Sequence, residues 1–442
     1  MPFDTLVFNS AAFLRRIKRR ILPYGNEEEY ESIVTSVVTK AEEYELQNSA
    51  YALANVKYYR ERYAGLRKYP ILTKSVVRQC FPDLLADDFA RMKHRQNTSG
   101  GSTGNPILLL QDAEYDRYVA HAINYFYREL LGYDTRALKK LLIWGSEADL
   151  LNWAGDWKKQ LVGVLRGTVY VNAFALSPRT LSLCVDTINS LKPDMIRGYA
   201  NSLFTLSRYM RDKARRVHAP LFIVSSAERL TDTMRATIEE AFKTRVFDFY
   251  GSRECGAIAG ECKQGNLHVL SFNHTVEVVN DVDMAVEPGE RGRLIVTTLH
   301  NRVMPLLRYE IGDIAIKGGE SCGCGNPLPT LKRIEGRISD NFLTKRGDII
   351  HGEYFTHLFY FKSSVKHFQV IQEDFDWIRI NLVVNGEFKE AEQEEITRRI
   401  RVVMGPECRT SFAILPEMPL TAHGKSLFTL SKIGNAKTHK FT

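Results

Sequence analysis

The segment Leu221-Phe222-Ile223-Val224-Ser225-Ser226-Ala227-Glu228 is an apolar run that ends abruptly in small and charged residues. Two earlier segments have the same form, at 141–145 and 195–199. Short apolar runs of this kind are typical of buried strands. Helical patterns occupy residues 177–192, 201–216 and 230–243. This alternation predicts a largely parallel sheet with crossover helices, in which ligands gather at the carboxyl ends of the strands.

The pattern changes on both sides of this region. Residues 1–95 are expected to be mostly helical, with a helix beginning at Glu27. After residue 267 strands dominate, at 275–279, 292–298 and 313–316. A smaller α+β unit is expected to follow, with strands near 366–372, 377–384 and 409–415 and a charged helix at 387–404.

The expected fold class is therefore α/β with two domains. A large N-terminal domain, residues 1–338, has mostly parallel sheets and a β-rich subdomain. A small, mobile α+β domain, residues 339–442, follows it. A chain of 442 residues is too long for one compact core, which agrees with this division.

Composition excludes several classes of protein. Apolar residues at 44% and charged residues at 25% are ordinary for a globular protein, and no apolar run is long enough to span a membrane. The seven cysteines without a secretion signal predict a reducing, cytoplasmic location. The net charge of +8 suits anionic nucleotides, and it would also fit weak attraction to nucleic acid or anionic lipid. Residues 8–22 predict a basic helix that is solvated at a domain edge or, as the weaker alternative, lies on a membrane surface.

Two segments far apart in the sequence suggest one nucleotide site closed by two domains. The loop Thr98-Ser99-Gly100-Gly101-Ser102-Thr103-Gly104 offers backbone N–H groups and hydroxyls to phosphates, and Lys425 stands in a Gly-Lys-Ser tail. Neither segment is a P-loop, because Asn105 follows the first and Pro419 replaces the leading glycine of the second. Taken alone, the loop is more often a surface turn.

Four further motifs follow in a particular order: Ser225 to Glu228, Phe247 to Glu254, Arg308 to Asp313, and Gly336 to Asp340. Together with the loop and Lys425, they resemble the adenylate-forming superfamily of acyl-CoA ligases, peptide-synthetase adenylation domains and luciferases, over residues 97–432. The chain looks most similar to the phenylacetate–CoA ligase family, in the CapK-like branch found in capsule and surface-polysaccharide gene clusters.

The resemblance implies a role for each motif. Residues 98–104 would hold the β- and γ-phosphates of ATP. The nucleotide would also be lined by Ser226, Ala227, Glu228, Phe249, Tyr250, Gly251 and Ser252. Asp313 would accept hydrogen bonds from the ribose hydroxyls, Arg337 would hold ribose or phosphate, and Glu254 would ligate Mg²⁺. Lys425 would bridge the substrate carboxylate and the α-phosphate.

The chain departs from the pattern of the family at two positions. Many relatives carry lysine where Asn105 stands, which removes one phosphate contact but leaves the backbone cradle. The family rotates its small domain between two half-reactions, at a hinge that Ser339 and Asp340 occupy here. Its usual hinge aspartate is Ser339 in this chain, so either residue is the expected pivot.

Four residues form a candidate zinc site: Cys262, His268, Cys322 and Cys324. Three thiolates and an imidazole suit tetrahedral Zn²⁺, and four protein ligands would make the metal structural. Some members of the phenylacetate–CoA ligase family have a structural zinc in this region. Cys255 is an alternative ligand; the remaining cysteines, Cys80, Cys184 and Cys408, are expected to be ordinary buried residues.

The identity of the acid is not encoded in any motif. Trp144 and Tyr199 end strands on the expected ligand side and are candidates for the acid pocket, although such aromatic residues are more often core. The first expected activity is ATP-dependent acyl adenylation of a carboxylic acid, followed by acyl transfer to CoA. The second transfers the acyl group to an amine or a sugar hydroxyl. A third, non-catalytic binding to nucleic acid or membrane, is disfavoured by the joint presence of Lys425, Glu254 and Asp313. A homodimer is left open.

Overall fold

The structure is a computed structural model, and it describes residues 27–66, 68–99, 107–136, 138–144, 167–172, 178–319, 321–337, 342–346, 348–350, 352–359, 362, 364–416 and 429–433. The chain divides into two compact units. The large unit contains Met1–Thr73, Cys80–Arg95 and Gln111–Glu335. The small unit contains Lys74–Gln79, Gln96–Leu110 and Gly336–Thr442.

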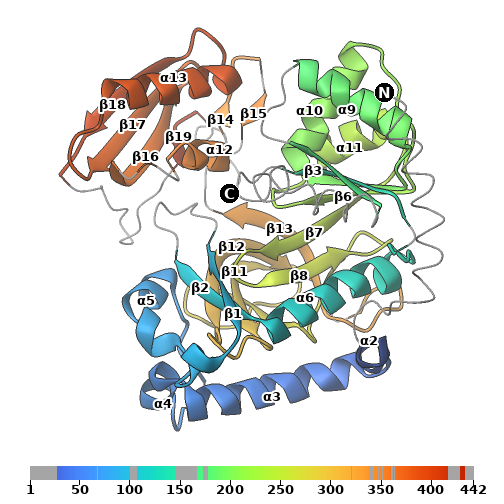
Figure 1. The fold of residues 1–442 in the computed structure, drawn as a ribbon, viewed down its shortest axis with the longest axis vertical. Helices are drawn as coiled ribbons and strands as arrows, with labels where there is room; N and C mark the ends of the chain where they lie inside the picture. Colours follow the sequence, from blue (N-terminus) through green and yellow to red (C-terminus); the bar gives the residue numbers. More distant parts are fainter. Residues whose placement is uncertain are drawn as a thin grey trace. The chain divides into compact units, whose positions relative to one another are not determined.

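The helices of the large unit surround one sheet (Figure 1). They are α2 (Glu27–Thr35), α3 (Val37–Asn55), α4 (Lys57–Arg62), α6 (Ala113–Tyr125), α9 (Pro178–Leu191), α10 (Ala200–Asp212) and α11 (Asp232–Phe242). The short turns are the 3₁₀ turns η1 (Phe81–Leu84) and η2 (Phe89–Arg91) and the π-helical turn η3 (Phe126–Leu130).

The sheet of the large unit has the strand order β10-β11-β12-β13-β9-β8-β7-β6-β5-β3-β4. Its strands are β3 (Lys140–Trp144), β4 (Thr168–Asn172), β5 (Met195–Tyr199), β6 (Phe222–Ser226), β7 (Val246–Ser252), β8 (Gly256–Glu261), β9 (Leu267–Val269), β10 (His274–Val279), β11 (Arg291–Thr298), β12 (Tyr309–Lys317) and β13 (Thr330–Arg337). Strands β3 to β7 are parallel to their neighbours, and β7 to β9 and β10 to β12 pair antiparallel. The expected parallel region and the β-rich region are therefore parts of one mixed sheet.

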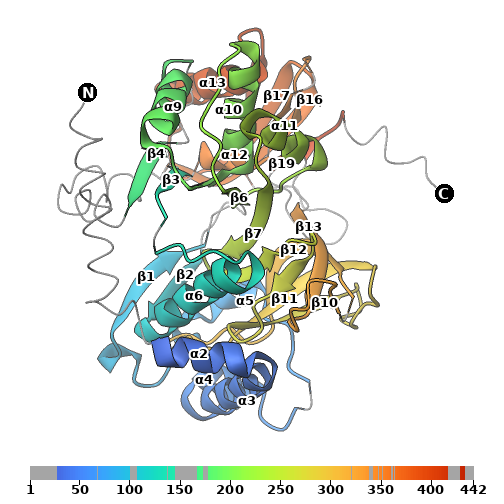
Figure 2. The ribbon, with the colours of Figure 1, turned by 90° about the vertical axis from the view of Figure 1, so that its right-hand side faces the viewer.

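Both faces of the parallel strands are buried, which explains their unbroken apolar runs. Ile223 of β6 points into a core formed with α9, α10 and α11, which lie together on one face (Figure 2). Phe222 and Val224 point to the opposite face and pack with α6 and η3. Because successive side chains of a strand alternate between faces, one short apolar segment supplies both cores.

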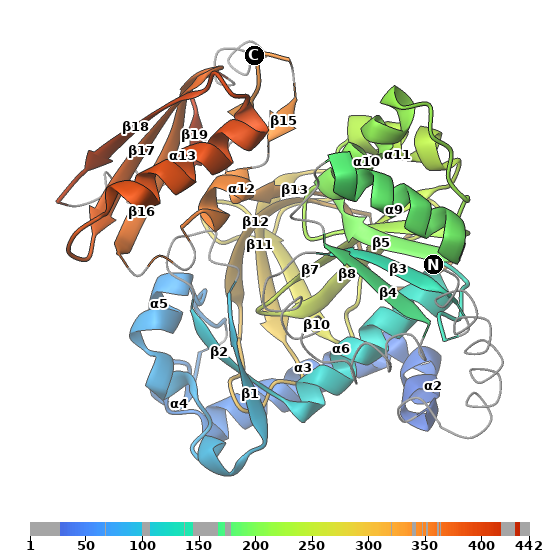
Figure 3. The ribbon, with the colours of Figure 1, turned by 45° about the horizontal axis from the view of Figure 1, so that its top comes forward.

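The small unit is an α+β structure. Its four-stranded sheet has the order β18-β17-β16-β19, and α13 packs across it (Figure 3). Its elements are α5 (Lys74–Gln79), β1 (His94–Thr98), β2 (Leu108–Asp112), β14 (Phe342–Leu343), β15 (Ile349–Ile350), α12 (Gly352–His357), β16 (Val365–Asp374), β17 (Trp377–Val384), α13 (Glu390–Met404), β18 (Arg409–Ile414) and β19 (Thr429–Ser431), of which β1 and β2 extend by two residues into the large unit.

The α/β fold class is confirmed, together with the expected elements at 195–199, 377–384 and 387–404. One strand was not expected and one expectation was wrong. A further strand, β19, follows β18 and pairs parallel with β16. Cys80 is half-buried, because it precedes a short 3₁₀ turn at the edge of the unit and not a core strand. Within the described residues no helix is both long and apolar enough to cross a membrane.

Candidate active site and candidate metal centre

The chain bends sharply where β6 ends. Ser226 Oγ donates a hydrogen bond of 3.0 Å to the carbonyl oxygen of Phe249 on β7 and accepts one of 3.3 Å from Arg197 on β5. Ala227 follows with a positive φ of 69°, which a residue with a Cβ adopts at a cost of roughly 1 kcal/mol. This strained residue turns the backbone away from the sheet directly after Ser226.

The β7–β8 hairpin holds Glu254 in its turn. Glu254 is 2% exposed, and the turn is fixed by Gln111 Nε2, which donates to the carbonyl oxygen of Arg253 at 2.8 Å. A Cβ on Gly251 would lie 2.4 Å from the carbonyl oxygen of Gly256, so the close approach of these two backbones requires glycine. The hairpin therefore presents a carboxylate from a tightly fixed backbone.

Asp313 contacts this hairpin from strand β12. Tyr250 Oη donates to Asp313 Oδ2 at 2.5 Å, so two residues 63 positions apart in the sequence meet. Gly312 has a φ of 95° and lies where the register between β11 and β12 is interrupted. A bulge with a glycine at this position re-aims the next side chain. Two of the predicted nucleotide-binding residues thus form one hydrogen-bonded pair.

The two aromatic candidates for the acid pocket also meet. The ring centroids of Trp144 and Tyr199 are 4.5 Å apart, at the carboxyl ends of β3 and β5. The guanidinium of Arg197 lies 5.4 Å from the Trp144 ring and 4.8 Å from the Phe249 ring. Arg197 had no expected role, although a charged residue inside an apolar strand was visible in the sequence.

Several predicted site residues are not located by the structure. Gly100, Gly101, Ser102, Thr103, Gly104, Ser339, Asp340 and Lys425 fall outside the described residues, and so does the side chain of Arg337. Thr98 and Ser99 belong to the small unit, where Ser99 Oγ accepts a hydrogen bond of 2.9 Å from the backbone N–H of Ile107. Their roles in binding phosphate stay predictions.

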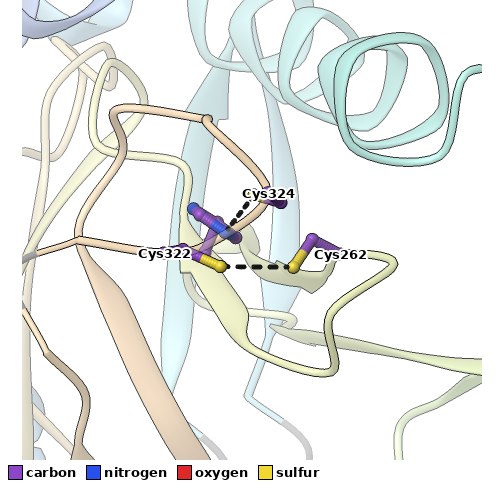
Figure 4. A group of neighbouring side chains, drawn as sticks. Cys262, Cys322 and Cys324 are labelled. Carbon is purple, nitrogen blue, oxygen red and sulfur yellow. Dashed lines mark hydrogen bonds between the residues drawn. The ribbon is translucent and has the colours of Figure 1, made fainter.

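The four residues of the candidate zinc site come together at one end of β8 and β9 (Figure 4). All four potential ligand atoms lie within 4.8 Å of one another. The sulfurs of Cys262 and Cys322 are 3.7 Å apart, and Cys324 Sγ lies 3.3 Å from His268 Nε2. Pairing of β9 with β13, in which Thr330 faces His268, brings the loop of Cys322 and Cys324 beside the β8–β9 turn.

The donor set and its surroundings fit a metal ion. In tetrahedral zinc sites with Zn–S distances of about 2.3 Å, two ligand sulfurs lie about 3.8 Å apart. His268 Nδ1 donates to the carbonyl oxygen of Leu328 at 3.0 Å, which directs Nε2 toward the sulfurs. Burial lowers the pKa of His268, which favours the neutral imidazole that a metal requires. Asn266 Nδ2 donates to Cys322 Sγ at 3.3 Å. Cys255, the alternative ligand, is buried and donates its backbone N–H to Ser252 Oγ.

A charge cluster formed by residues of α11, β7 and β8 was not expected. Burial, and then the neighbouring Glu261, raise the pKa of Asp248 on β7 to about 7. Glu261 is paired at 2.8 Å with Arg235 and accepts the backbone N–H of Asp248 at 2.7 Å. The sequence places these residues 13 to 26 positions apart, and the pairing of β7 with β8 and the packing of α11 against these strands bring them together.

Comparison with known proteins shows similarity to acyl-CoA ligases in fold and to CapK in sequence. The structure resembles 2-hydroxyisobutyryl-CoA ligase in its thioesterification state, with a TM-score of 0.60 at 17% identity, over 93% of this chain and 92% of that one. Residues 342–432 match the family of the CapK C-terminal domain. The fold is that of a solved acyl-CoA ligase, and the sequence is similar to CapK and to phenylacetate-coenzyme A ligases.

Two relatives in sequence show which proteins the chain resembles. The chain is 25% identical to Protein CapK of Staphylococcus aureus over 84% of its own length and 81% of that protein. It is 28% identical to a phenylacetate-coenzyme A ligase of Thermus thermophilus over 34% of its length and 35% of that protein. CapK and the phenylacetate–CoA ligases are therefore its relatives, as the motif order predicted.

Proposed function

We propose that this protein uses ATP to activate a carboxylic acid as an acyl adenylate and then transfers the acyl group to CoA. An oxygen of the acid attacks the α-phosphorus, and the bond from phosphorus to the bridging oxygen of pyrophosphate breaks. The thiol of CoA then attacks the acyl carbon, AMP leaves, and the thiol proton passes to solvent. The solved structural relative carries a related adenylate together with CoA.

The hydrogen bond between Tyr250 and Asp313 carries the proposal. It joins the residue proposed to line adenine to the residue proposed to bind both ribose hydroxyls. Each ribose hydroxyl can donate to a carboxylate oxygen, and a Tyr hydroxyl that holds one of these oxygens fixes the direction of the other. Ser226, bonded to the carbonyl oxygen of Phe249, extends the same wall of the site across β6 and β7.

In this proposal, Glu254, the loop of residues 98–104 and Lys425 act on the phosphates of ATP. Glu254 would hold Mg²⁺, which would neutralise charge on the leaving pyrophosphate. The loop of residues 98–104 would receive the β- and γ-phosphates on its N–H groups, and Lys425 would bridge the acid and the α-phosphate. A lysine point charge suits the negative charge that develops there. Ser339 and Asp340 would provide the hinge that withdraws Lys425 before thioester formation. Zinc at the Cys262 cluster would be structural, because four protein ligands leave no open position.

Similarity to CapK favours one alternative acceptor. The relative covers 84% of the chain, and its name suggests surface-polysaccharide synthesis. A sugar hydroxyl or an amine would then attack the adenylate, giving an ester or an amide without CoA. The proposal includes a cytoplasmic location, where ATP and CoA are supplied.

The proposal is tested by measuring pyrophosphate release from ATP with a panel of aryl, acyl and amino acids, each with and without CoA. Acid-dependent release that requires Asp313 and Glu254 supports adenylation. Formation of a CoA thioester supports the first acceptor, and release that is indifferent to CoA supports the second. Absence of acid-dependent release across the panel, with ATP still bound, would contradict the proposal.

A further inference from the structure

We propose that the acid activated by this protein carries a second anionic group, and that Arg197 binds this group. The inference rests on the proposed function, since it assigns the substrate class of the same site. Arg197 belongs to the large unit and lies among the residues that the structure describes.

Strand β5 places Arg197 on the side of the sheet that faces α6. In the register of the sheet Arg197 is paired with Leu142 of β3 and Val224 of β6, and Val224 belongs to the core on that face. The neighbour Ile196 points into the opposite core. The long side chain of Arg197 extends toward the carboxyl ends of the strands, where it reaches Ser226. This is the end at which ligands of open α/β sheets bind.

The contacts of the Arg197 guanidinium with described residues are neutral. It contacts the hydroxyl of Ser226 at 3.3 Å, and it lies 4.8 and 5.4 Å from the ring centroids of Phe249 and Trp144. Nε is buried and has no hydrogen-bond partner among the described residues. In the part of the chain that the structure describes, no carboxylate forms an ion pair with Arg197.

Two other arginines of the large unit differ in this respect. Arg308 pairs with Glu277 at 2.7 Å, and Arg235 pairs with Glu261 at 2.8 Å. An arginine stays charged at every accessible pH, and withdrawing its charge from water is costly without an anion. Arg197 therefore has capacity for an anion that the described protein does not supply. The planar guanidinium fork matches a carboxylate or another oxyanion.

The group bound by Arg197 is distinct from the carboxylate that reacts. Adenylation converts the reacting carboxylate into a neutral acyl group. An arginine dedicated to it would stabilise the starting acid more than the transition state and would slow the first step. A second oxyanion keeps its charge through both half-reactions. Arg197 then contributes uniform binding, which lowers KM for the acid without slowing the chemistry.

The test uses matched pairs of acids that differ by one charge: succinate and butyrate, glutarate and valerate, phthalate and benzoate. Binding to the full-length protein is measured by calorimetry, and pyrophosphate release is measured in parallel. The variants are Arg197→Met, which removes the charge at similar length, and Arg197→Lys, which keeps the charge without the fork. Arg245→Met is the control, because Arg245 lies 4.9 Å from the Phe247 ring before β7 begins, at the other end of the strand.

The wild type is expected to bind the dianionic member of at least one pair about 30-fold or more tightly than its partner, as loss of a desolvated charge pair implies. Arg197→Met should abolish this preference and leave KM for ATP unchanged, Arg197→Lys should retain part of it, and Arg245→Met should retain all of it. Should Arg197→Met fail to fold, Arg197→Lys with a weakened preference serves the same purpose.

Three results would overturn the assignment. One is a wild type without charge preference in any pair. Another is an Arg197→Met protein that keeps the preference. The last is an Arg197→Met protein that loses affinity for both members of a pair equally or shows a raised KM for ATP. Equal loss would assign Arg197 to the reacting carboxylate, and a raised KM for ATP would assign it to a phosphate. If no acid releases pyrophosphate but the binding preference exists and depends on Arg197, the proposed adenylation fails and the Arg197 assignment stands.

Discussion

The buried carboxyl of Asp248 makes stability depend on pH in a direction opposite to that of most acidic residues. Its pKa rises from the ordinary value of 3.8 to about 7, first because of burial and then because of Glu261, and Arg235 offsets part of the effect. The folded protein therefore keeps a proton that the unfolded chain has already released. Between about pH 4 and pH 7 this group lowers stability as pH rises.

The size of the effect follows from this interval. At about 1.4 kcal/mol for each pH unit, the full interval corresponds to about 4 kcal/mol. Asp248 as a whole residue is only half-buried, and screening by water reduces the effect, so about 2 kcal/mol is expected. Asp248→Asn removes the titration and leaves the pair of Arg235 and Glu261 intact. Relative to wild type, the variant should gain about 2 kcal/mol between pH 4.5 and pH 8.

Urea unfolding at pH 4.5, 6 and 8 measures this difference, and other titrating groups cancel because both proteins carry them. Asp281→Asn is the matched control, since Asp281 lies exposed in a turn. Its stability relative to wild type should not change with pH. A constant difference between Asp248→Asn and wild type at all three pH values would refute the reasoning, as would a gain for Asp248→Asn at low pH only.

Three further predictions concern the site. Purified protein should contain about one zinc ion per chain. Cys322→Ser should lose the zinc and unfold at a lower temperature, whereas the control Cys184→Ser should keep the zinc. A wild-type protein that contains no zinc and is fully stable would contradict the structural role of the cluster. Lys425→Ala should reduce adenylation by about 100-fold or more with ATP binding little changed, and equal wild-type and variant rates would remove the assigned role. Tyr250→Phe should raise KM for ATP by about 10-fold through loss of one charge-assisted hydrogen bond to Asp313, and an unchanged KM would show that Asp313 needs no such positioning.

The sequence predicted local structure well where one segment held the whole signal. The apolar run before Ser226 predicted a buried strand, and the charged segment at 387–404 predicted a helix, because alternation and helical spacing are properties of single elements. The short strand β19 was missed, since three residues carry no period and their pairing with β16 is long-range.

Contacts between distant segments could not be predicted in the same way. The residue types of the Cys262 cluster suggested a metal, but only the pairing of β9 with β13 brings its ligands together. Tyr250 and Asp313 belonged to separate motifs, and a bulge at Gly312 unites them. Arg197 belonged to no recognisable motif, because the residues that it contacts, Ser226, Trp144 and Phe249, come from three other strands.

The most direct test of the central claim is acid-dependent release of pyrophosphate from ATP by the full-length protein, followed with and without CoA. The account predicts that at least one acid causes release, that AMP forms in equal amount, that Lys425→Ala slows release by about 100-fold or more, and that Asp313→Asn also slows it. Release of pyrophosphate that needs no acid, or an undiminished rate in both variants, would contradict the account.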